Sequence, residues 1–512
     1  MKHAESTTSR EFGQAHAGAQ PGPADTPQDT RAATVKTHVP VGLIERHAIF
    51  IAGKWQEPAS KEAITVTNPA TEEPFAAVPS GTPADVDAAV TAAANALATW
   101  SQSSLNERAA VLRQIALSIE ARAEEITRTI VREVGQPEHL AAQLQTASPA
   151  ENLRIIADSI HEVAWKEQIG HTVVRRAPAG VVGAITPWNV PLLMICMKAG
   201  GALAAGCTVV LKGSEIAPLS SFIFAEMAQE AGLPDGVFNL VSGTGPEVGE
   251  ALVAHPLVDM VSLTGSVRAG RRVMEVAAQS IKRVGLELGG KSANVILEDS
   301  DFERAVSEGI ADAFRNAGQA CGGLTRVLVP RWRLAEASEI AVEKARSYVL
   351  GDPFDPATTL GPVTTNGQRE RIRGYIRAGI EEDARMLTGG PEAPAALERG
   401  YFVQPTVFTG DNTMRIAREE IFGPVVVIIP FDGESDAIEI ANDSPYGLAA
   451  GVWCADDEHA WAIATRLRVG RVRINGSPVN RRAPHGGFKL SGIGREWGRF
   501  GIEEFLEYQS IG

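Results

Sequence analysis

The stretch Val181-Val182-Gly183-Ala184-Ile185 is a short apolar run that leads directly into Thr186-Pro187-Trp188-Asn189. Three similar runs follow it along the chain, at 208–211, 237–241 and 260–263, and helical segments separate them. Short apolar strands that alternate with helices predict a parallel α/β sheet. Ligands of such a sheet bind at the carboxyl ends of its strands. The residues that follow each run are therefore the first candidates for a binding site.

Glycine, hydroxyl or charged residues follow each of the other three runs. Lys212-Gly213-Ser214-Glu215 follows the second run, and the glycine-rich segment 243–249 follows the third. The glycine-rich segment is similar to a dinucleotide fingerprint, but it has one residue too many between its second and third glycines, so alone it is weak evidence. Thr264-Gly265-Ser266 follows the fourth run and precedes a predicted helix over 267–278. The free N–H groups of that helix would bind a pyrophosphate.

A second segment places a single cysteine among glycines and amides, in the sequence Phe314-Arg315-Asn316-Ala317-Gly318-Gln319-Ala320-Cys321-Gly322-Gly323. A lone cysteine is often a small buried hydrophobe. The adjoining glycine pair, however, lets the backbone approach a ligand closely, and a thiolate there can attack a carbonyl carbon. The strand-like run 326–329 follows, which places Cys321 on a loop at a strand end. Cys321 is therefore a candidate nucleophile.

Composition excludes several other classes of protein. The 512 residues are enough for two or three domains, and 44% apolar with 21% charged residues is typical of a soluble globular protein. A net charge of −14 without a stripe of Lys and Arg argues against a nucleic-acid partner. The four cysteines show neither a C-x-x-C pair nor zinc-finger spacing, so we expect no disulfide framework, no metal site and a reducing, cytoplasmic compartment. The chain contains no run of about 20 apolar residues, so the sequence predicts no membrane span.

The N-terminal part of the chain divides into a tail and a helical region. Residues 1–44 are rich in small and polar residues with almost no large apolar side chains, which predicts a disordered tail. Folding is expected to begin with a short strand and turn at 49–55. From 83 to about 133 the apolar residues recur at helical spacing.

From about Phe50 to the C-terminus the chain resembles the aldehyde dehydrogenase superfamily. The resemblance implies an α/β fold with a Rossmann-type cofactor domain, an α/β catalytic domain and a small β hairpin for oligomerisation. The motifs occur in the family's order and at its usual spacing. They are Pro187-Trp188-Asn189, Lys212 through Glu215, Thr264-Gly265-Ser266, Glu287-Leu288-Gly289-Gly290-Lys291, Gly318-Gln319-Ala320-Cys321, Glu420-Ile421-Phe422-Gly423-Pro424 and Pro484-His485-Gly486-Gly487-Phe488-Lys489-Leu490-Ser491-Gly492.

The resemblance implies three catalytic residues for oxidation of an aldehyde to a carboxylic acid. Cys321 would form a thiohemiacetal, whose alkoxide pushes out the hydride, and then a thioester. The Asn189 amide and the backbone N–H of Cys321 would bind the oxyanion. Glu287 would activate the water that hydrolyses the thioester and help to deprotonate Cys321. Taken alone, Asn189 could be an ordinary turn residue, whereas a carboxylate in the apolar surroundings of Glu287 is costly to bury without a partner.

The resemblance also implies NAD as the cofactor, with NADP less favoured. Glu215 would accept hydrogen bonds from the adenosine ribose and meet a 2′-phosphate as a like charge. The nicotinamide would lie near Glu420 and Phe422. The implied cofactor-binding residues are Ile185, Thr186, Pro187, Trp188, Lys212, Ser214, Glu215, Gly245, Gly249, Thr264, Gly265, Ser266, Leu288, Glu420 and Phe422.

The same resemblance divides the chain into domains. It implies an NAD-binding domain at 45–160 and 180–286, a catalytic domain at 287–495, and an oligomerisation segment at 161–179 and 496–512. A hairpin in the first part of that segment, with 503–511 as its partner strand, would join subunits into a homodimer or homotetramer, because exposed edge strands pair between subunits.

Some positions depart from the family's common pattern without removing a reacting group. Gly213 stands where proline is frequent, Cys207 where asparagine is, and Leu263 where phenylalanine is usual. Met197 replaces the tryptophan of a Trp-Lys pair, of which Lys198 is retained, and His485 replaces a frequent phenylalanine. His485 and the Gly322-Gly323 pair adjoin the expected substrate entrance, where they either tune specificity or only pack.

Two alternative functions stay open at this point. A CoA-acylating relative would transfer the acyl group to CoA instead of water, but the presence of Glu287 favours water. A non-catalytic structural or binding member of the fold would be expected to lack at least one of Asn189, Glu287 and Cys321, and all three are present. The sequence does not define which aldehyde is oxidised.

Overall fold

The larger of the two main sheets has eight strands in the order β20-β12-β11-β8-β9-β10-β2-β3. The structure is a computed structural model that describes residues 43–512. The four strands predicted from the apolar runs form the parallel centre of this sheet, and a fifth, β12, lies beside them. Their bounds are β8 (Val181–Ile185), β9 (Thr208–Lys212), β10 (Phe238–Leu240), β11 (Met260–Thr264) and β12 (Arg283–Glu287).

The four predicted strands are parallel to one another, as expected, whereas the strands at the two edges of this sheet pair antiparallel. At one edge lies a hairpin of β2 (Ile49–Ile51), which is the predicted short strand, and β3 (Lys54–Gln56); β2 pairs with β10. At the other edge, β20 (Gly492–Ile493) pairs with β12. A tight hairpin can form only between antiparallel strands, which explains the orientation of β3 relative to β2.

The second main sheet has seven strands in the order β15-β16-β17-β14-β13-β18-β19. All neighbouring strands are parallel except β15 and β16. The run after Cys321 forms β14, as predicted. The bounds are β13 (Ala293–Ile296), β14 (Arg326–Pro330), β15 (Arg385–Thr388), β16 (Thr406–Thr409), β17 (Val425–Phe431), β18 (Ala449–Trp453) and β19 (Arg471–Ile474).

Helices connect and cover the strands of both sheets. The helical region predicted over 83–133 is three helices, and one boundary between them is set by Ser104, whose side chain accepts from the Glu107 N–H at 3.2 Å as a helix cap. The predicted helix at 267–278 is α9. Those around the first sheet are α1 (Pro83–Trp100), α2 (Leu105–Ala121), α3 (Ala123–Val134), α4 (Glu138–Ala142), α5 (Ser148–Ser159), α6 (Pro191–Ala205), α7 (Leu219–Glu230), α8 (Glu250–Ala254) and α9 (Val267–Ala278).

The remaining helices include six that belong to the second sheet: α10 (Phe302–Phe314), α11 (Leu334–Arg346), α12 (Asn366–Glu381), α13 (Arg415–Arg418), α14 (Glu434–Asn442) and α15 (Asp457–Ala464). Separate apolar clusters pack against the two sheets, one containing Leu153, Leu203 and Phe222 and the other Val295, Ile310 and Ile428. These clusters agree with a division near Glu287, although β20 crosses it to join the first sheet. The domain boundaries stay a prediction.

Two small three-stranded sheets complete the described fold. One contains β1 (Ile44–Glu45), β4 (Ala63–Asn68) and β5 (Glu73–Pro79). Because β1 begins at Ile44, the predicted tail ends one residue too late, and its first 42 residues lie outside the described part. The other consists of β6 (Lys166–Ile169), β7 (Thr172–Pro178) and β21 (Leu506–Ile511), which follows α16 (Gly498–Glu503).

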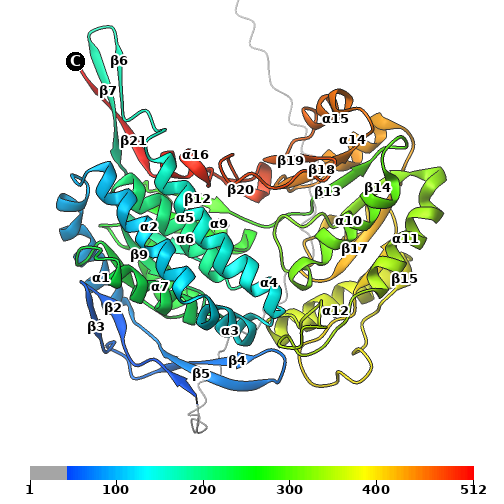
Figure 1. Cartoon of the computed structure of the whole chain (residues 1–512), viewed down its shortest axis with the longest axis horizontal. Helices are drawn as coiled ribbons and strands as arrows, with labels where there is room; N and C mark the ends of the chain where they lie inside the picture. The colour runs from blue at the N-terminus through cyan, green and yellow to red at the C-terminus, as the bar shows by residue number, and fades with distance from the viewer. Residues whose placement is uncertain (1–42) are drawn as a thin grey trace, which may run out of the picture. The chain divides into compact units, whose positions relative to one another are not determined.

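This last sheet contains the predicted hairpin and its predicted partner strand, and it projects from the neighbouring helices as an arm (Figure 1).

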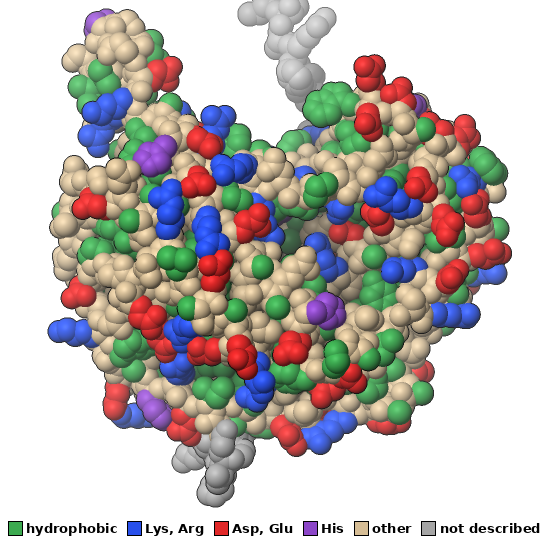
Figure 2. All heavy atoms as spheres, in the orientation of Figure 1, with side chains coloured by type: hydrophobic (Ala, Val, Ile, Leu, Met, Phe, Trp, Pro, Cys, Tyr) green, Lys and Arg blue, Asp and Glu red, His purple; other side chains and the backbone are tan. Residues whose placement is uncertain are grey.

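On the face shown in Figure 2, basic and acidic side chains are interspersed, without a basic stripe. None of the helices in residues 43–512 is long and apolar enough to cross a bilayer.

Candidate active site

The loop that carries Cys321 has an unusual backbone. Just after α10, three successive residues are left-handed, with φ of 55° at Asn316, 53° at Ala317 and 72° at Gly318. Such a conformation costs free energy for residues other than glycine and is concentrated at functional sites. A Cβ at Gly318 would lie 2.0 Å from the Gly423 carbonyl oxygen, so only glycine fits there. Cys321 lies just beyond this turn and is partly exposed, whereas the other three cysteines are buried.

Asn189 is held against the same loop. Its side-chain amide donates to the Gln319 carbonyl at 3.0 Å, and its own carbonyl accepts from Asn316 Nδ2 at 3.1 Å and from Gln136 Nε2 at 2.9 Å. These contacts join the carboxyl end of β8 to the Cys321 loop, 130 residues further along the chain. The structure therefore brings Asn189 beside the candidate nucleophile, with one amide hydrogen engaged by Gln319 and the other left for a ligand.

Glu287 is the last residue of β12 and is buried, at 6% exposure. Neither of its carboxylate oxygens accepts a hydrogen bond from any residue in 43–512. His485 Nε2 lies 3.5 Å from one of them. A Cβ at Gly290 would lie 2.7 Å from the Cys321 carbonyl oxygen, so the loop that follows Glu287 passes directly against the backbone of Cys321. The three predicted catalytic residues therefore meet in one place.

Burial makes both reacting groups hard to ionise. It raises the pKa of Cys321 to about 12, and the carboxylates of Glu287 and Glu420 add to this effect. Burial also raises the pKa of Glu287 well above its ordinary value, with Glu496 as the next largest cause, while Lys198 opposes the shift. Near neutral pH the Cys321 thiol is therefore protonated in the protein alone, and it must lose its proton during the reaction.

A buried ion pair next to Glu287 was missed from the sequence. Lys198 Nζ, in α6, lies 2.8 Å from Glu496 Oε1 and 3.0 Å from Ser262 Oγ. Glu496 also exchanges two backbone hydrogen bonds with His485, at 2.7 and 2.9 Å. One signal was present, because a lysine in the apolar sequence of α6 cannot be buried without a partner. The identity of that partner, however, could not be read from the chain.

The predicted ribose-binding residues lie together at the end of β9. Lys212 Nζ lies 2.5 Å from Glu215 Oε2, and Lys212 is buried while the Glu215 side chain is 37% exposed. Ser214 lies between them and accepts from the Ile216 N–H at 3.2 Å. The structure also explains why glycine stands at 213, where the family often has proline. A Cβ at Gly213 would lie 2.0 Å from Ser221 Oγ and 3.1 Å from Ser221 Cβ, so a larger residue would require the Ser221 side chain to move.

The glycine-rich segment after β10 is one turn of π-helix, Gly245–Gly249, which runs into α8. This wider turn accounts for the extra residue between its glycines. A Cβ at Gly245 would meet nothing within 4 Å, so the backbone there is open to a ligand. At the end of β11, Thr264 and Gly265 lead to Ser266, which caps α9 by accepting from the Ala269 N–H at 3.2 Å.

Two hydroxyls near these strand ends have no partner. Thr186 Oγ1 and Thr264 Oγ1 are buried without a hydrogen bond to any residue in the described chain. Unsatisfied hydroxyls beside the start of a long helix and an open glycine backbone suit a phosphate-containing ligand. These residues therefore fit a dinucleotide. Ile185 and Leu288, also predicted at this site, lie at the ends of β8 and β12.

Residues from both sheets form the predicted nicotinamide side. The Trp188 and Phe422 rings lie perpendicular with centroids 5.4 Å apart, and Pro187 precedes Trp188 on the loop from β8. Glu420 Oε1 accepts from the Gly290 N–H at 3.1 Å, and burial raises the pKa of Glu420 to about 7. The loops that carry the predicted cofactor, base and nucleophile residues are thus connected through direct contacts.

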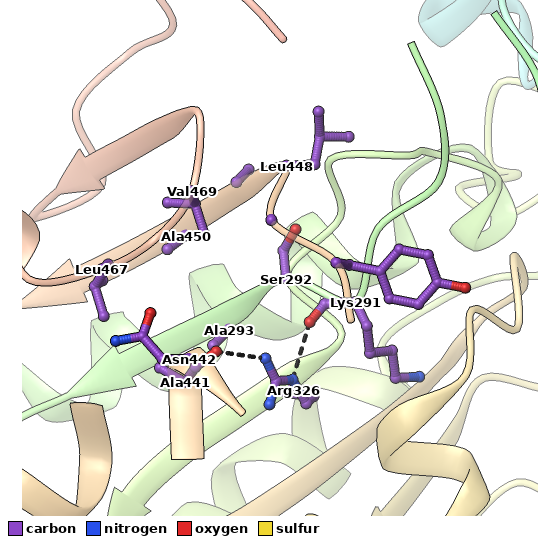
Figure 3. A pocket seen from close by; sticks show the side chains of 13 residues that line it. Lys291, Ser292, Ala293, Arg326, Ala441, Asn442, Leu448, Ala450, Leu467 and Val469 are labelled. Carbon is purple, nitrogen blue, oxygen red and sulfur yellow. Dashed lines mark hydrogen bonds between the residues drawn. The ribbon is translucent and has the colours of Figure 1, made fainter. Parts of the chain in front are cut away.

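A buried arginine holds the loop after Glu287 in place (Figure 3). Arg326 Nε donates to the Lys291 carbonyl at 2.9 Å, and Arg326 Nη2 donates to the Ala441 carbonyl at 2.9 Å. The small cavity beside it, of about 10 Å³, has room for about one water molecule. It contains none of the predicted catalytic residues, and it therefore supports the site without being part of it.

Comparison with known proteins agrees with this geometry. The model of the aldehyde dehydrogenase family matches residues 55–511. A 3-succinoylsemialdehyde-pyridine dehydrogenase from a Pseudomonas species is 46% identical over 464 residues, which cover 90% of this chain and 97% of the relative.

Several solved structures have TM-scores of 0.90 to the chain, and two of them contain NAD+. One is a cysteine-to-alanine mutant of aldehyde dehydrogenase C from Pseudomonas syringae with NAD+ and octanal, 48% identical, covering 91% of this chain and 96% of that chain. The other is an aldehyde dehydrogenase from Mycobacterium tuberculosis with NAD+, 42% identical, covering 92% and 98%.

The chain belongs to the aldehyde dehydrogenase family. It is an NAD-dependent enzyme that oxidises aldehydes. The predicted fold class is confirmed.

Proposed function

We propose that Cys321 is the nucleophile, Asn189 an oxyanion donor and Glu287 the base in this aldehyde oxidation. The observation that carries the assignment is the meeting of the three residues around one loop, through the contacts of Asn189 with Gln319 and of Gly290 with the Cys321 backbone. The remaining predicted residues, from Ile185 to Phe422, are proposed to hold NAD.

The sequence of steps follows from these positions. Glu287, once ionised, takes the thiol proton of Cys321, and the thiolate attacks the aldehyde carbon. The free amide hydrogen of Asn189 then stabilises the negative oxygen. Bound NAD supplies the acceptor for the hydride that leaves this carbon. Glu287 then releases the thiol proton to solvent and deprotonates the water that attacks the thioester carbon. The C–S bond breaks, Cys321 leaves as the thiolate and the carboxylic acid is released.

Water is proposed as the acyl acceptor in preference to CoA. Both oxygens of the Glu287 carboxylate lack a hydrogen-bond partner within the described chain and are therefore available to hold a water molecule beside Cys321. The test is product analysis during NADH formation with and without CoA. Acid formed at the same rate in both supports hydrolysis, whereas an acyl-CoA product would favour the alternative.

We expect NAD to be preferred over NADP by about tenfold, which requires only about 1.4 kcal/mol. The 2′-phosphate of NADP would meet the carboxylate of Glu215, although Lys212 at 2.5 Å offsets part of the repulsion. In Glu215→Gln the relative kcat/KM for NADP should rise. The matched control is Glu275→Gln, which removes an exposed carboxylate from α9. Equal use of both cofactors by the wild type, or no relative gain for NADP in the mutant, would refute this role.

The pH dependence of Cys321 alkylation tests the raised pKa. Below its pKa a thiol is protonated and reacts slowly, so a pKa near 12 means that alkylation of the free enzyme by iodoacetamide keeps rising through pH 9. An ordinary cysteine, with a pKa of about 8.5, would already approach its plateau. Mass spectrometry identifies the labelled residue, and Cys321→Ala gives the background. A plateau below pH 8 would contradict the prediction.

We also propose that the arm formed by β6, β7 and β21 joins subunits into a homodimer or homotetramer. Supporting this, apolar side chains on the arm are exposed, with Ile169 at 58%, Tyr508 at 68% and Ile511 at 50%. Sedimentation velocity should show particles of at least twice the 54.3 kDa chain mass, and a monomer would contradict the proposal.

The four free cysteines support a reducing, cytoplasmic compartment.

A further inference from the structure

Arg471, the first residue of β19, has a guanidinium without an acidic partner. No carboxylate in residues 43–512 lies within 4.0 Å of it, and its Nε is buried without a hydrogen bond there. A Cβ at Gly322 would lie 3.2 Å from Arg471 Nη2, so the guanidinium lies beside the residue that follows Cys321. An unpaired cation in such a place is unfavourable unless a ligand supplies the opposite charge.

The surroundings of Arg471 add positive charge near the nucleophile. Arg315 and Arg473 share a single carboxylate partner among residues 43–512. Asp312 Oδ1 lies 3.8 Å from Arg315 Nη2 and 3.3 Å from Arg473 Nη1. The positive charges of Arg315 and Arg471 both act to lower the pKa of Cys321. In a chain with a net charge of −14, the three arginines on this side of Cys321 form a local excess of positive charge, opposite to the effect of Glu287 and Glu420 on the thiol.

An apolar wall lies next to this cationic group. The Trp497 ring packs in a buried cluster with Leu193 and Met197. Val190, which follows Asn189 in the chain, is partly buried and packs against this cluster. The Arg471 Cζ lies 5.5 Å from the centroid of the Trp497 ring. The region beside Cys321 therefore combines a carbon-lined surface with a cation that lacks a partner.

We propose that the preferred substrate is an aldehyde that carries a carboxylate, which Arg471 binds while the Trp497 cluster contacts the carbon chain. This inference rests on the proposed function, because it requires that the aldehyde react at Cys321. The planar guanidinium forms paired hydrogen bonds with a carboxylate, which a neutral chain end cannot replace. Arg471 is thus a specificity-determining residue.

The test compares matched substrates, since Arg471 could instead act only on the thiolate of Cys321. For each chain length from four to eight carbons, kcat/KM with NAD is measured for the ω-carboxylate aldehyde and for the straight-chain aldehyde of equal length. The wild type should prefer the carboxylate. In Arg471→Met the ratio of the two kcat/KM values should fall by about 10- to 100-fold, and in Arg471→Lys by less, because the ammonium keeps the charge without the fork.

Arg466→Met is the control, since it removes an exposed arginine whose partner, Glu434, is far from the site in sequence; its substrate ratio should equal that of the wild type. If Arg471→Met does not fold, as judged by circular dichroism, the ratio in Arg471→Lys decides. A wild type without preference for the carboxylate, or an equal loss for both substrates in the Arg471 variants, would overturn the inference while leaving aldehyde oxidation intact. Failure to oxidise either substrate would overturn the proposed function as well.

Discussion

Replacing Cys321 by alanine should lower aldehyde oxidation by at least about a thousandfold, because it removes the proposed nucleophile that forms the covalent adduct. NAD binding should change less than about twofold, since the predicted dinucleotide contacts come from the ends of β8, β9 and β11 and from the β10 loop. NADH formation with a saturating aldehyde measures the first effect, and titration calorimetry with NAD measures the second.

The other cysteines provide matched controls for this change. Cys454→Ala and Cys196→Ala remove the same atom from buried positions. Each should retain activity and lose about 1 kcal/mol of unfolding free energy, as a small buried side chain does when it is truncated. Activity above a few per cent of wild type in Cys321→Ala would reject the assignment of the nucleophile.

Replacing Glu287 by glutamine should slow steady-state oxidation by about 10²- to 10⁴-fold, the usual contribution of a general base. If the main task of Glu287 is to activate water, the first turnover should still produce NADH as a burst, after which the enzyme accumulates as a thioester. Rapid-mixing absorbance measures the burst. Mass spectrometry of the quenched enzyme should find one acyl group on Cys321.

The pattern of failure distinguishes the roles of Glu287. Loss of the burst together with the slow steady state would mean that Glu287 mainly deprotonates the thiol. Rates equal to wild type would exclude both roles, and recovery of turnover on addition of CoA would favour the CoA-acylating alternative. Glu503→Gln, which changes a residue in α16, is the control for loss of one carboxylate and should behave as the wild type.

Local sequence determined the central strands and several helices of this protein. The apolar runs from Val181 to Leu263 are strands because each is buried on both faces of a parallel sheet, so burial shows directly in composition. The helix at 267–278 is equally local, since a hydroxyl cap and apolar spacing define it. The strand β2 was predicted, but its pairing with β10 was not, and neither was β20 or its pairing with β12, because each pairing joins segments distant in the chain.

The three proposed catalytic residues were found through motifs, whereas their electrostatic surroundings came only from the tertiary structure. Lys198 and Glu496 are 298 residues apart, and no local pattern indicates that they pair. The lack of a carboxylate within 4.0 Å of Arg471 in residues 43–512 is likewise a property of packing, because it depends on every segment that surrounds β19. The sequence by itself therefore predicted the proposed reacting groups. The fold decided how their charges are balanced, since electrostatic energies depend on distance and burial in space.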